Sequence, residues 1–123
     1  MKPAIARRIA AALGFLAVAF GAFGAHGLKG LLLRNGTAEI WEKAVFYHFL
    51  HAVMLFVLAE RDQLPAAAWR CFLAGILLFS GSLYLLAVTD LRWLGVLTPL
   101  GGLLLLAGWL MLFLDAWQSH SDC

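Results

Sequence analysis

Residues 71–89 read CFLAGILLFSGSLYLLAVT, a run of 19 residues without a charged side chain. A helix that crosses the hydrocarbon core of a bilayer needs about 20 apolar residues, within a range of about 17–25. In lipid, only a helix satisfies all its backbone hydrogen bonds within one segment. This stretch therefore predicts a membrane-spanning helix.

Three further uncharged runs flank this stretch, at residues 9–28, 44–59 and 93–114. The middle one is short, but a helix starting after a Thr37 cap could enter the membrane at Trp41, an aromatic anchor, while Lys43 extends its ammonium group to water. We therefore predict an all-α integral membrane protein, a single domain built as an antiparallel bundle of four transmembrane helices. The spans are expected at about 9–28, 39–59, 70–89 and 96–116 of residues 1–123.

The composition excludes several classes of protein. Hydrophobic residues make up 63% of the chain and charged residues 13%, against about 45–50% and about 25% in soluble domains. A domain of this size has too little interior to bury that surplus, so a soluble globular enzyme is excluded. Lys and Arg exceed Asp and Glu by only two and are scattered, which argues against a nucleic acid partner. The expected partner is the lipid bilayer.

The first run could instead belong to a cleaved signal peptide. Basic residues precede it, and the small residues around Ala22 to Ala25, near its end, could mimic a cleavage site. The apolar part of a signal peptide is normally about 7–15 residues long, whereas this run has 20. We therefore favour a retained span.

The fourth run leaves two alternatives at Thr98-Pro99. Proline is well tolerated in the first turn of a helix and threonine is a good cap, so a regular helix could run from Thr98 to about Trp117. The alternative is one longer helix kinked at Pro99. We favour the cap.

An even number of spans puts both termini on the same side of the membrane. The first helix usually dominates orientation, and its leader carries Lys2, Arg7 and Arg8, so we predict cytoplasmic termini. The two cysteines, Cys71 and Cys123, would then stay unpaired in a reducing compartment.

Glycines recur along the spans at spacings that suit close helix contacts. Lipid supplies no hydrophobic force between helices, so small residues that let backbones approach are expected at the interfaces. The candidates for helix packing are Gly14, Gly21, Gly24, Gly75, Gly81, Gly101 and Gly108.

Histidines are the first functional candidates, because polar residues inside a membrane are costly and often functional. His48 and His51 share a helix face, and His26 ends the first span, so three imidazoles could converge on a metal or haem iron. With no carboxylate or cysteine beside them in the spans, the ligand set is incomplete. The alternative is that they form interhelical hydrogen bonds, with Ser80, Ser82 and Tyr84 as partners.

Catalysis and proton transport find little support in the spans. Ser80-Gly81-Ser82 within a helix supplies no oxyanion hole. No Asp or Glu lies inside any span, whereas proton-coupled transporters usually carry an embedded carboxylate. We expect no enzyme activity and no cofactor.

Several motifs together resemble one known family. They are residues 21–27, Trp41 with Ala44 and 47–51, residues 79–84, residues 98–102 and Gly108-Trp109. They resemble domain-of-unknown-function family 423 (DUF 423), the YgdD-like small bacterial inner-membrane proteins related to transmembrane protein 256, over about residues 9–114. The resemblance implies four spans in the bacterial inner (cell) membrane and no known activity. It also implies glutamine where this chain has His48, which favours hydrogen bonding there, whereas His26 and His51 match the pattern.

The sequence thus predicts a small integral membrane protein of unknown activity, structural or accessory, alone, as a homo-oligomer or beside a larger membrane partner. The alternative is a protein that binds a metal, haem, quinone or lipid through its intramembrane histidines. A minimal transporter or channel is a third possibility.

Overall fold

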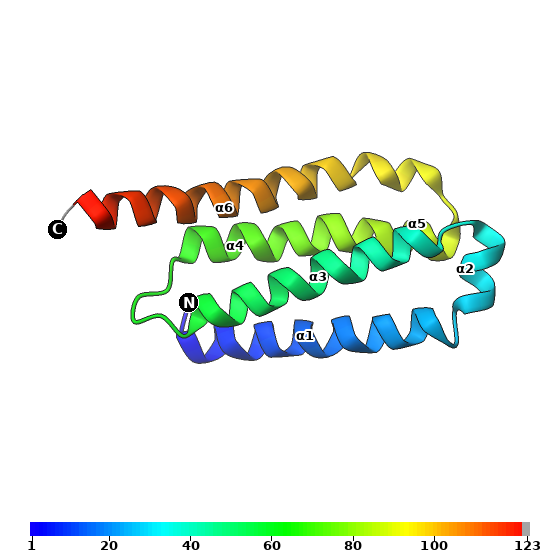
Figure 1. The fold of residues 1–123 in the computed structure, drawn as a ribbon, viewed down its shortest axis with the longest axis horizontal. Coiled ribbons are helices and arrows are strands. Elements are labelled where there is room, and N and C mark those ends of the chain that lie inside the picture. Colours follow the sequence, from blue (N-terminus) through cyan, green and yellow to red (C-terminus); the bar gives the residue numbers. More distant parts are fainter. Residues whose placement is uncertain (122–123) are drawn as a thin grey trace.

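The computed structural model describes the backbone of residues 1–121 and the side chains of residues 1–118. Four helical segments are long and apolar enough to cross a membrane, which confirms the predicted all-α membrane fold. They run antiparallel, and both ends of the described chain lie at the same end of the molecule (Figure 1). The elements in order are α1 (Pro3–Ala25), α2 (Lys29–Asn35), α3 (Ala38–Ala59), α4 (Ala66–Gly75), η1 (Ile76–Ser80), α5 (Gly81–Thr89), η2 (Arg92–Val96) and α6 (Thr98–Ser121).

The connection between the first two spans contains a short helix, α2, that the sequence analysis did not predict. Gly36, whose backbone is in the left-handed helical conformation with φ of +66°, ends this helix and turns the chain into α3. Thr37 precedes α3 as expected, but its hydroxyl makes no cap hydrogen bond there. It donates instead to the Ala87 carbonyl oxygen of α5, 2.7 Å away.

The third span is a continuous helix of three parts, α4, η1 and α5. Its middle part, Ile76–Ser80, is a π-helical turn, in which each backbone bond reaches one residue further than in an α-helix. Such a turn rotates the side chains that follow it relative to a regular helix. Residues 66–89 thus form one candidate span that begins earlier than the expected residue 70.

The fourth candidate span runs from Arg92 to Gln118, against the expected 96–116, and its regular helix begins where the sequence predicts. Regular helix starts at Thr98, with Pro99 in its first turn, after a 3₁₀ segment at Arg92–Val96. Proline lacks a backbone N–H, which costs nothing in the first turn of a helix. α6 continues to Ser121, beyond the expected Trp117.

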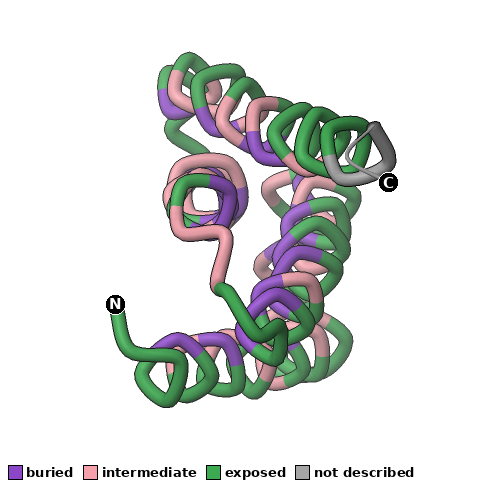
Figure 2. Tube along the Cα trace, turned by 90° about the vertical axis from the view of Figure 1, so that its left-hand side faces the viewer, coloured by how far each residue is buried: buried purple, intermediate pink, exposed green. Residues whose placement is uncertain are grey.

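The four spans form a curved row with α3 and the α4–α5 span in the middle. α1 packs on α3, and α6 packs on α4 and η1, whereas α1 and α6 have no substantial contact within the described residues. Figure 2 shows α1 and α6 at opposite edges of this arrangement, with buried residues on the faces that the helices turn toward one another. The largest fully buried side chains, Trp69 and Phe72 of α4, belong to the main apolar cluster, to which α1, α3 and α6 also contribute.

Exposed ion pairs link the elements at the end that carries the termini. Arg7 of α1 lies 3.5 Å from Glu60, and Arg61 lies 3.3 Å from Asp115 of α6. About half of each side chain is exposed, so each pair contributes at most about 1 kcal/mol to stability.

Three glycines allow the close approach of the α4–η1 segment to α6. A Cβ added to Gly101 would overlap the backbone of Phe79 and would lie 2.8 Å from the carbonyl carbon of Leu78. A Cβ at Gly75 would lie 2.8 Å from Leu105 Cγ, and one at Gly108 would lie 2.6 Å from the ring of Phe72. The Cβ at Gly75 would also lie 3.1 Å from the Gly101 carbonyl oxygen, but at Gly101 all three nearest atoms are backbone atoms, so this is the closest point of the contact.

Two glycines on α1 face α3. A Cβ at Gly24 would overlap the indole of Trp41, and one at Gly21 would lie 3.4 Å from Val45. Gly24 therefore makes room for the Trp41 side chain.

Two of the predicted packing glycines do not pack against a neighbouring helix. An added Cβ at Gly14 or Gly81 would meet no atom within 4 Å. Antiparallel register pairs Gly21 with Val45, so the residue opposite Gly14 is Ala52, whose methyl group is short. Gly81 follows the π-helical turn of Ile76–Ser80, which changes the direction of the residues after it. It therefore does not share with Gly75 the face that contacts α6.

We expect Gly101→Ala to destabilise the bundle far more than Gly102→Ala, because the new methyl group at Gly101 would force two backbones apart. Overpacking of this kind costs about 1–3 kcal/mol. A Cβ at Gly102 would touch only the Phe79 ring, at 3.8 Å. The free energies of unfolding in detergent measure the difference, and equal values for the two variants would contradict the assigned contact.

Candidate functional site

The intramembrane polar residues gather on the buried face of α3 and on the helices that contact it. His48 and His51 lie one helical turn apart, and each is 3% exposed. Ser80 and Ser82 of the third span are also buried. The predicted cluster thus exists in part, and the hydrogen bonds of each member determine what it can do.

Both ring nitrogens of His51 are occupied. Trp109 of α6 donates its indole N–H to Nε2 of His51, 3.0 Å away, and Nδ1 lies 2.8 Å from the Tyr47 carbonyl oxygen. An indole can only donate and a carbonyl can only accept, so Nε2 must be unprotonated and Nδ1 must carry the hydrogen. The contacts therefore fix His51 as neutral imidazole in the Nδ1–H form, with no lone pair free for a metal.

His48 contacts the third span through Tyr84. Its Nδ1 lies 2.8 Å from the Tyr84 hydroxyl, and either group could donate. The other nitrogen, Nε2, is buried and has no hydrogen-bond partner among the described residues. The ring of Phe20 on α1 lies edge-on to the His48 ring at a centroid distance of 6.3 Å. His48 therefore joins α3 to α5 and packs against α1 through its ring.

Aromatic rings enclose His48 on the side of α1. The ring of Phe20 on α1 meets the Tyr84 ring edge-on, with their centroids 4.9 Å apart. The ring centroids of Trp41 and Tyr84 lie 4.7 Å apart. Trp41 also donates its indole N–H to the Phe20 carbonyl oxygen at 2.8 Å. These contacts tie α1, α3 and α5 together and leave the imidazole in apolar surroundings.

The two serines hydrogen-bond to neighbouring helices. Ser80 Oγ donates to the Ala44 carbonyl oxygen of α3 at 2.8 Å. Ser82 Oγ lies 2.7 Å from the Thr98 hydroxyl of α6 and 3.0 Å from the Phe79 carbonyl oxygen. Neither serine is bonded to a base, which a nucleophilic hydroxyl requires.

His26 lies away from the other two histidines. It follows the last residue of α1 and is exposed. Gly24, two residues before His26, lies beside Trp41, so His26 lies near the start of α3. His48 lies seven residues after Trp41 along α3, which is about 10 Å at the rise of an α-helix. The expected convergence of three imidazoles is therefore wrong. Within the described residues, no three His, Cys, Asp or Glu side chains come close enough to hold a metal ion.

Cys71 is half-buried and free, and Cys123 lies outside the described residues.

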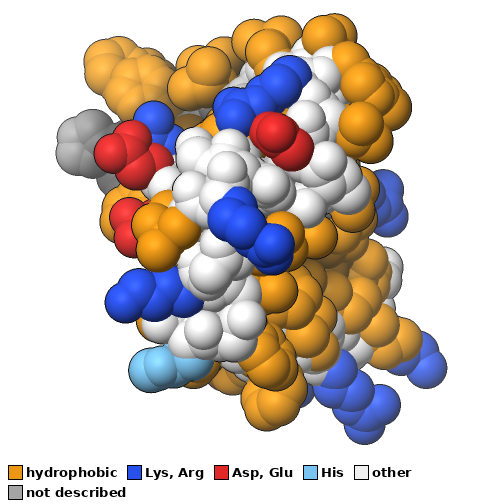
Figure 3. Space-filling view, turned by 90° about the vertical axis from the view of Figure 1, so that its right-hand side faces the viewer, with side chains coloured by type: hydrophobic (Ala, Val, Ile, Leu, Met, Phe, Trp, Pro, Cys, Tyr) orange, Lys and Arg blue, Asp and Glu red, His pale blue; other side chains and the backbone are white. Residues whose placement is uncertain are grey.

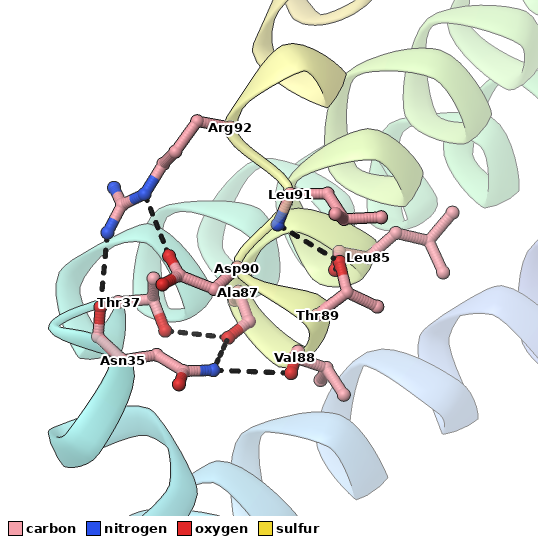
Figure 4. A network of polar contacts seen from close by, with 9 residues as sticks. All are labelled: Asn35, Thr37, Leu85, Ala87, Val88, Thr89, Asp90, Leu91 and Arg92. Carbon is pink, nitrogen blue, oxygen red and sulfur yellow. Dashed lines mark hydrogen bonds and ion pairs between the residues drawn. The ribbon is translucent and has the colours of Figure 1, made fainter.

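A second polar network, which the sequence analysis did not predict, closes the end of the bundle opposite the termini (Figure 4). The side-chain amide of Asn35 donates to the carbonyl oxygens of Ala87 and Val88 at 3.1 and 3.2 Å. The Ala87 oxygen also accepts the hydrogen bond from the Thr37 hydroxyl. Arg92 donates to Asp90 at 2.8 Å and to the Asn35 carbonyl oxygen at 3.1 Å. The network satisfies carbonyls at the end of α5, which have no partner within the helix.

A residue with a left-handed backbone conformation makes this network possible. Asp90, with φ of +58°, ends α5 and turns the chain so that Arg92 returns toward Asn35. Aspartate tolerates this conformation better than most residues. Asn35-Gly36 in the sequence signals a turn, but nothing in it shows that the asparagine caps a helix 52 residues away.

Trp69 is a further polar contact that the sequence analysis did not single out. Its side chain is fully buried, and its indole N–H donates to the Leu55 carbonyl oxygen at 3.1 Å. A tryptophan at the start of a span suggests an interfacial anchor. Here it instead joins α4 to α3.

Comparison with known proteins places the chain among membrane proteins. The family described as "Protein of unknown function (DUF423)" matches residues 20–102. The UPF0382 membrane protein YwdK of Bacillus subtilis is 46% identical over 108 residues, which cover 82% of this chain and 86% of the relative. A UPF0382 membrane protein of Staphylococcus haemolyticus is 44% identical over 108 residues, covering 84% and 87%. No solved structure matches the chain.

The Trp109–His51 hydrogen bond is expected to stabilise the contact between α3 and α6. A double-mutant cycle of His51→Leu and Trp109→Phe should give a coupling energy of about 1 kcal/mol, within the range measured for interhelical bonds in membranes. Unfolding in detergent with increasing dodecyl sulfate measures each free energy.

Glutamine is the matched control at this position. Its side-chain oxygen can accept the Trp109 hydrogen bond as Nε2 does, so His51→Gln should retain more stability than His51→Leu. Additive effects of the two substitutions in the cycle would show that the bond contributes nothing.

Proposed function

We propose that this chain, which belongs to the DUF423 family of membrane proteins, is an accessory protein of the cell membrane that acts through the surfaces of its helical bundle. It is a small integral membrane protein with four candidate spans. Family membership gives it a membrane location and assigns no chemistry.

The observation that carries the proposal is how its intramembrane polar groups are used. His51 donates one hydrogen bond and accepts another, and His48 bonds to Tyr84 through Nδ1. Ser80, Ser82 and Tyr84 likewise bond to neighbouring helices. In hydrocarbon such bonds hold helices together where hydrophobic force cannot. A group that performs this role is not available to a metal, haem or substrate.

The partner in this proposal is another membrane protein or a second copy of the chain. The outer sides of α1 and α6 are not covered by other helices of the bundle. Large side chains such as Phe15 on α1 and Leu106 on α6 are 74% and 66% exposed. These sides can face lipid or a neighbouring membrane protein.

The proposed orientation has both termini in the cytoplasm. Lys2, Arg8 and Arg70 lie toward the end that carries the termini, and basic residues at helix ends favour the cytoplasmic side. Labelling of single engineered cysteines in intact cells with a reagent that cannot cross the membrane tests it: residues near the termini should be protected and those in α2 labelled.

We expect the purified protein in mild detergent to carry no stoichiometric metal, haem or other chromophore. Native mass spectrometry gives its subunit number and any bound mass, elemental analysis gives its metal content, and the visible spectrum detects haem. His51→Gln, which can keep the Trp109 bond, should leave all three results unchanged.

A different result would overturn the proposal. A haem absorption band or a stoichiometric metal that is lost in His48→Gln and His51→Gln, while both variants stay folded, would make this a cofactor-binding protein. Substrate flux across liposomes that contain the purified chain would make it a transporter.

A further inference from the structure

An apolar groove runs between α1 and α3 on the outer side of the bundle. It has a volume of about 900 Å³, within the range of about 300–1,000 Å³ of small-molecule sites. Small residues of α1 such as Ala17 and Ala22 line one wall, and larger residues of α3 such as Phe49 and Val53 line the other. Phe49 and Val53 are 45% and 46% exposed, so the groove opens outward to the surrounding lipid.

Beyond its charged end, the groove has about the length of one leaflet of a bilayer. Its lining on α3 runs from Ala38 to Val53, and the part from Glu42 to Val53 is about 16 Å long at 1.5 Å per residue. Half of the hydrocarbon core is about 15 Å thick. A transmembrane helix of a partner would cross the full thickness of about 30 Å, so it would extend well beyond this groove. The length therefore suits an acyl chain that enters from one surface.

Charged side chains stand at one end of the groove. Glu42 and Phe46 line both the groove and a smaller notch of about 370 Å³, which Glu39 and Lys43 complete. None of the three charged residues forms an ion pair within the described part of the chain. Trp41, buried beside Gly24, lies at the same end.

This end of the groove lies at a surface where charges of both signs gather. Figure 3 looks onto the end of the bundle that carries α2 and shows Lys, Arg, Asp and Glu side chains across it, with hydrophobic side chains down the flanks. An interface between bilayer and water has the same division, because head groups lie above acyl chains. The notch is therefore placed at head-group level, and the groove extends below it.

We propose that the groove between α1 and α3 binds a phospholipid with an amino head group, of the phosphatidylethanolamine type, with an acyl chain in the groove and the head group in the notch. The primary ammonium would meet the carboxylates of Glu39 and Glu42, and the phosphate would meet the ammonium of Lys43. This site is separate from the histidine cluster, and the proposal does not depend on which side of the membrane the termini occupy.

The charges select among lipids. Two carboxylates and one ammonium give the notch a net negative charge, which disfavours an anionic lipid such as phosphatidylglycerol. The quaternary ammonium of phosphatidylcholine has no N–H to donate, so it cannot form charge-assisted hydrogen bonds with the carboxylates. A primary ammonium can donate to both.

Native mass spectrometry of the full chain in detergent, with one dioleoyl phospholipid added at a time, tests the proposal. We expect more bound phosphatidylethanolamine than phosphatidylglycerol or phosphatidylcholine at equal concentration. Glu42→Gln should lower the retained phosphatidylethanolamine about two- to fivefold, the effect of losing one exposed ion pair. Asp62→Asn is the charge-matched control, since this exposed residue lies between α3 and α4, at the other end of the bundle.

A second pair of variants tests the apolar part of the site. Ala22→Leu would fill the groove from α1, whereas Ala11→Leu adds the same side chain at an exposed position of α1 outside the groove. Only Ala22→Leu should reduce lipid retention, and the unfolding free energies of both should stay close to that of the original chain.

Three outcomes would overturn the proposal. Equal retention of the three lipids, or equal loss in Glu42→Gln and Asp62→Asn, would show that the notch does not select the head group. A dimer that disappears only in Ala22→Leu would show that a second copy occupies the groove. A bound metal or haem would instead contradict the proposed function and would leave this site untouched.

Discussion

The constraint on which this structure depends is that polar groups buried in hydrocarbon must find partners within the protein. α3 meets it for most of the bundle. Its backbone carbonyls accept hydrogen bonds from Ser80 of η1 and Trp69 of α4, and His51 accepts from Trp109 of α6. Trp41 donates in the other direction, to a carbonyl of α1. Each neighbouring span is thus joined to α3 by a directed bond, and such bonds specify which helices meet and at what height.

The third span contacts its two neighbours in different ways, by close backbone packing on one side and by hydrogen bonding on the other. Toward α6 the contact rests on Gly101, where two backbones meet without an intervening side chain. Toward α3 it rests on Ser80, at the end of the π-helical turn, whose hydroxyl reaches the Ala44 carbonyl. The turn alters the direction of the side chains that follow it, and so allows Ser82 to reach Thr98 on α6.

The outer surface is where the proposed function and the proposed lipid site meet. The interior polar groups of the bundle hold its helices together, so in this proposal partners bind to the outer surfaces of the helices. The α1–α3 groove is one such edge, because small residues on α1 lie opposite large ones on α3. Its charged end, with Glu42 and Lys43 at the level of Trp41, gives it a polarity that matches a lipid rather than a second helix.

Hydropathy and the uncharged runs in the sequence were enough to predict four helical spans. Thr98-Pro99 was enough to predict where the last regular helix begins. Both features are local. The roles of the polar residues were not local. Whether His51 could bind a metal depended on Trp109, 58 residues away, and whether Gly81 packed depended on the rotation of one helix against another. The sequence by itself determined that the chain crosses a membrane, since the cost of backbone in lipid leaves no other choice. Only the tertiary structure decided that His26 lies apart, that His51 uses both ring nitrogens in hydrogen bonds and that His48 uses one, because hydrogen-bond partners are set by how helices meet.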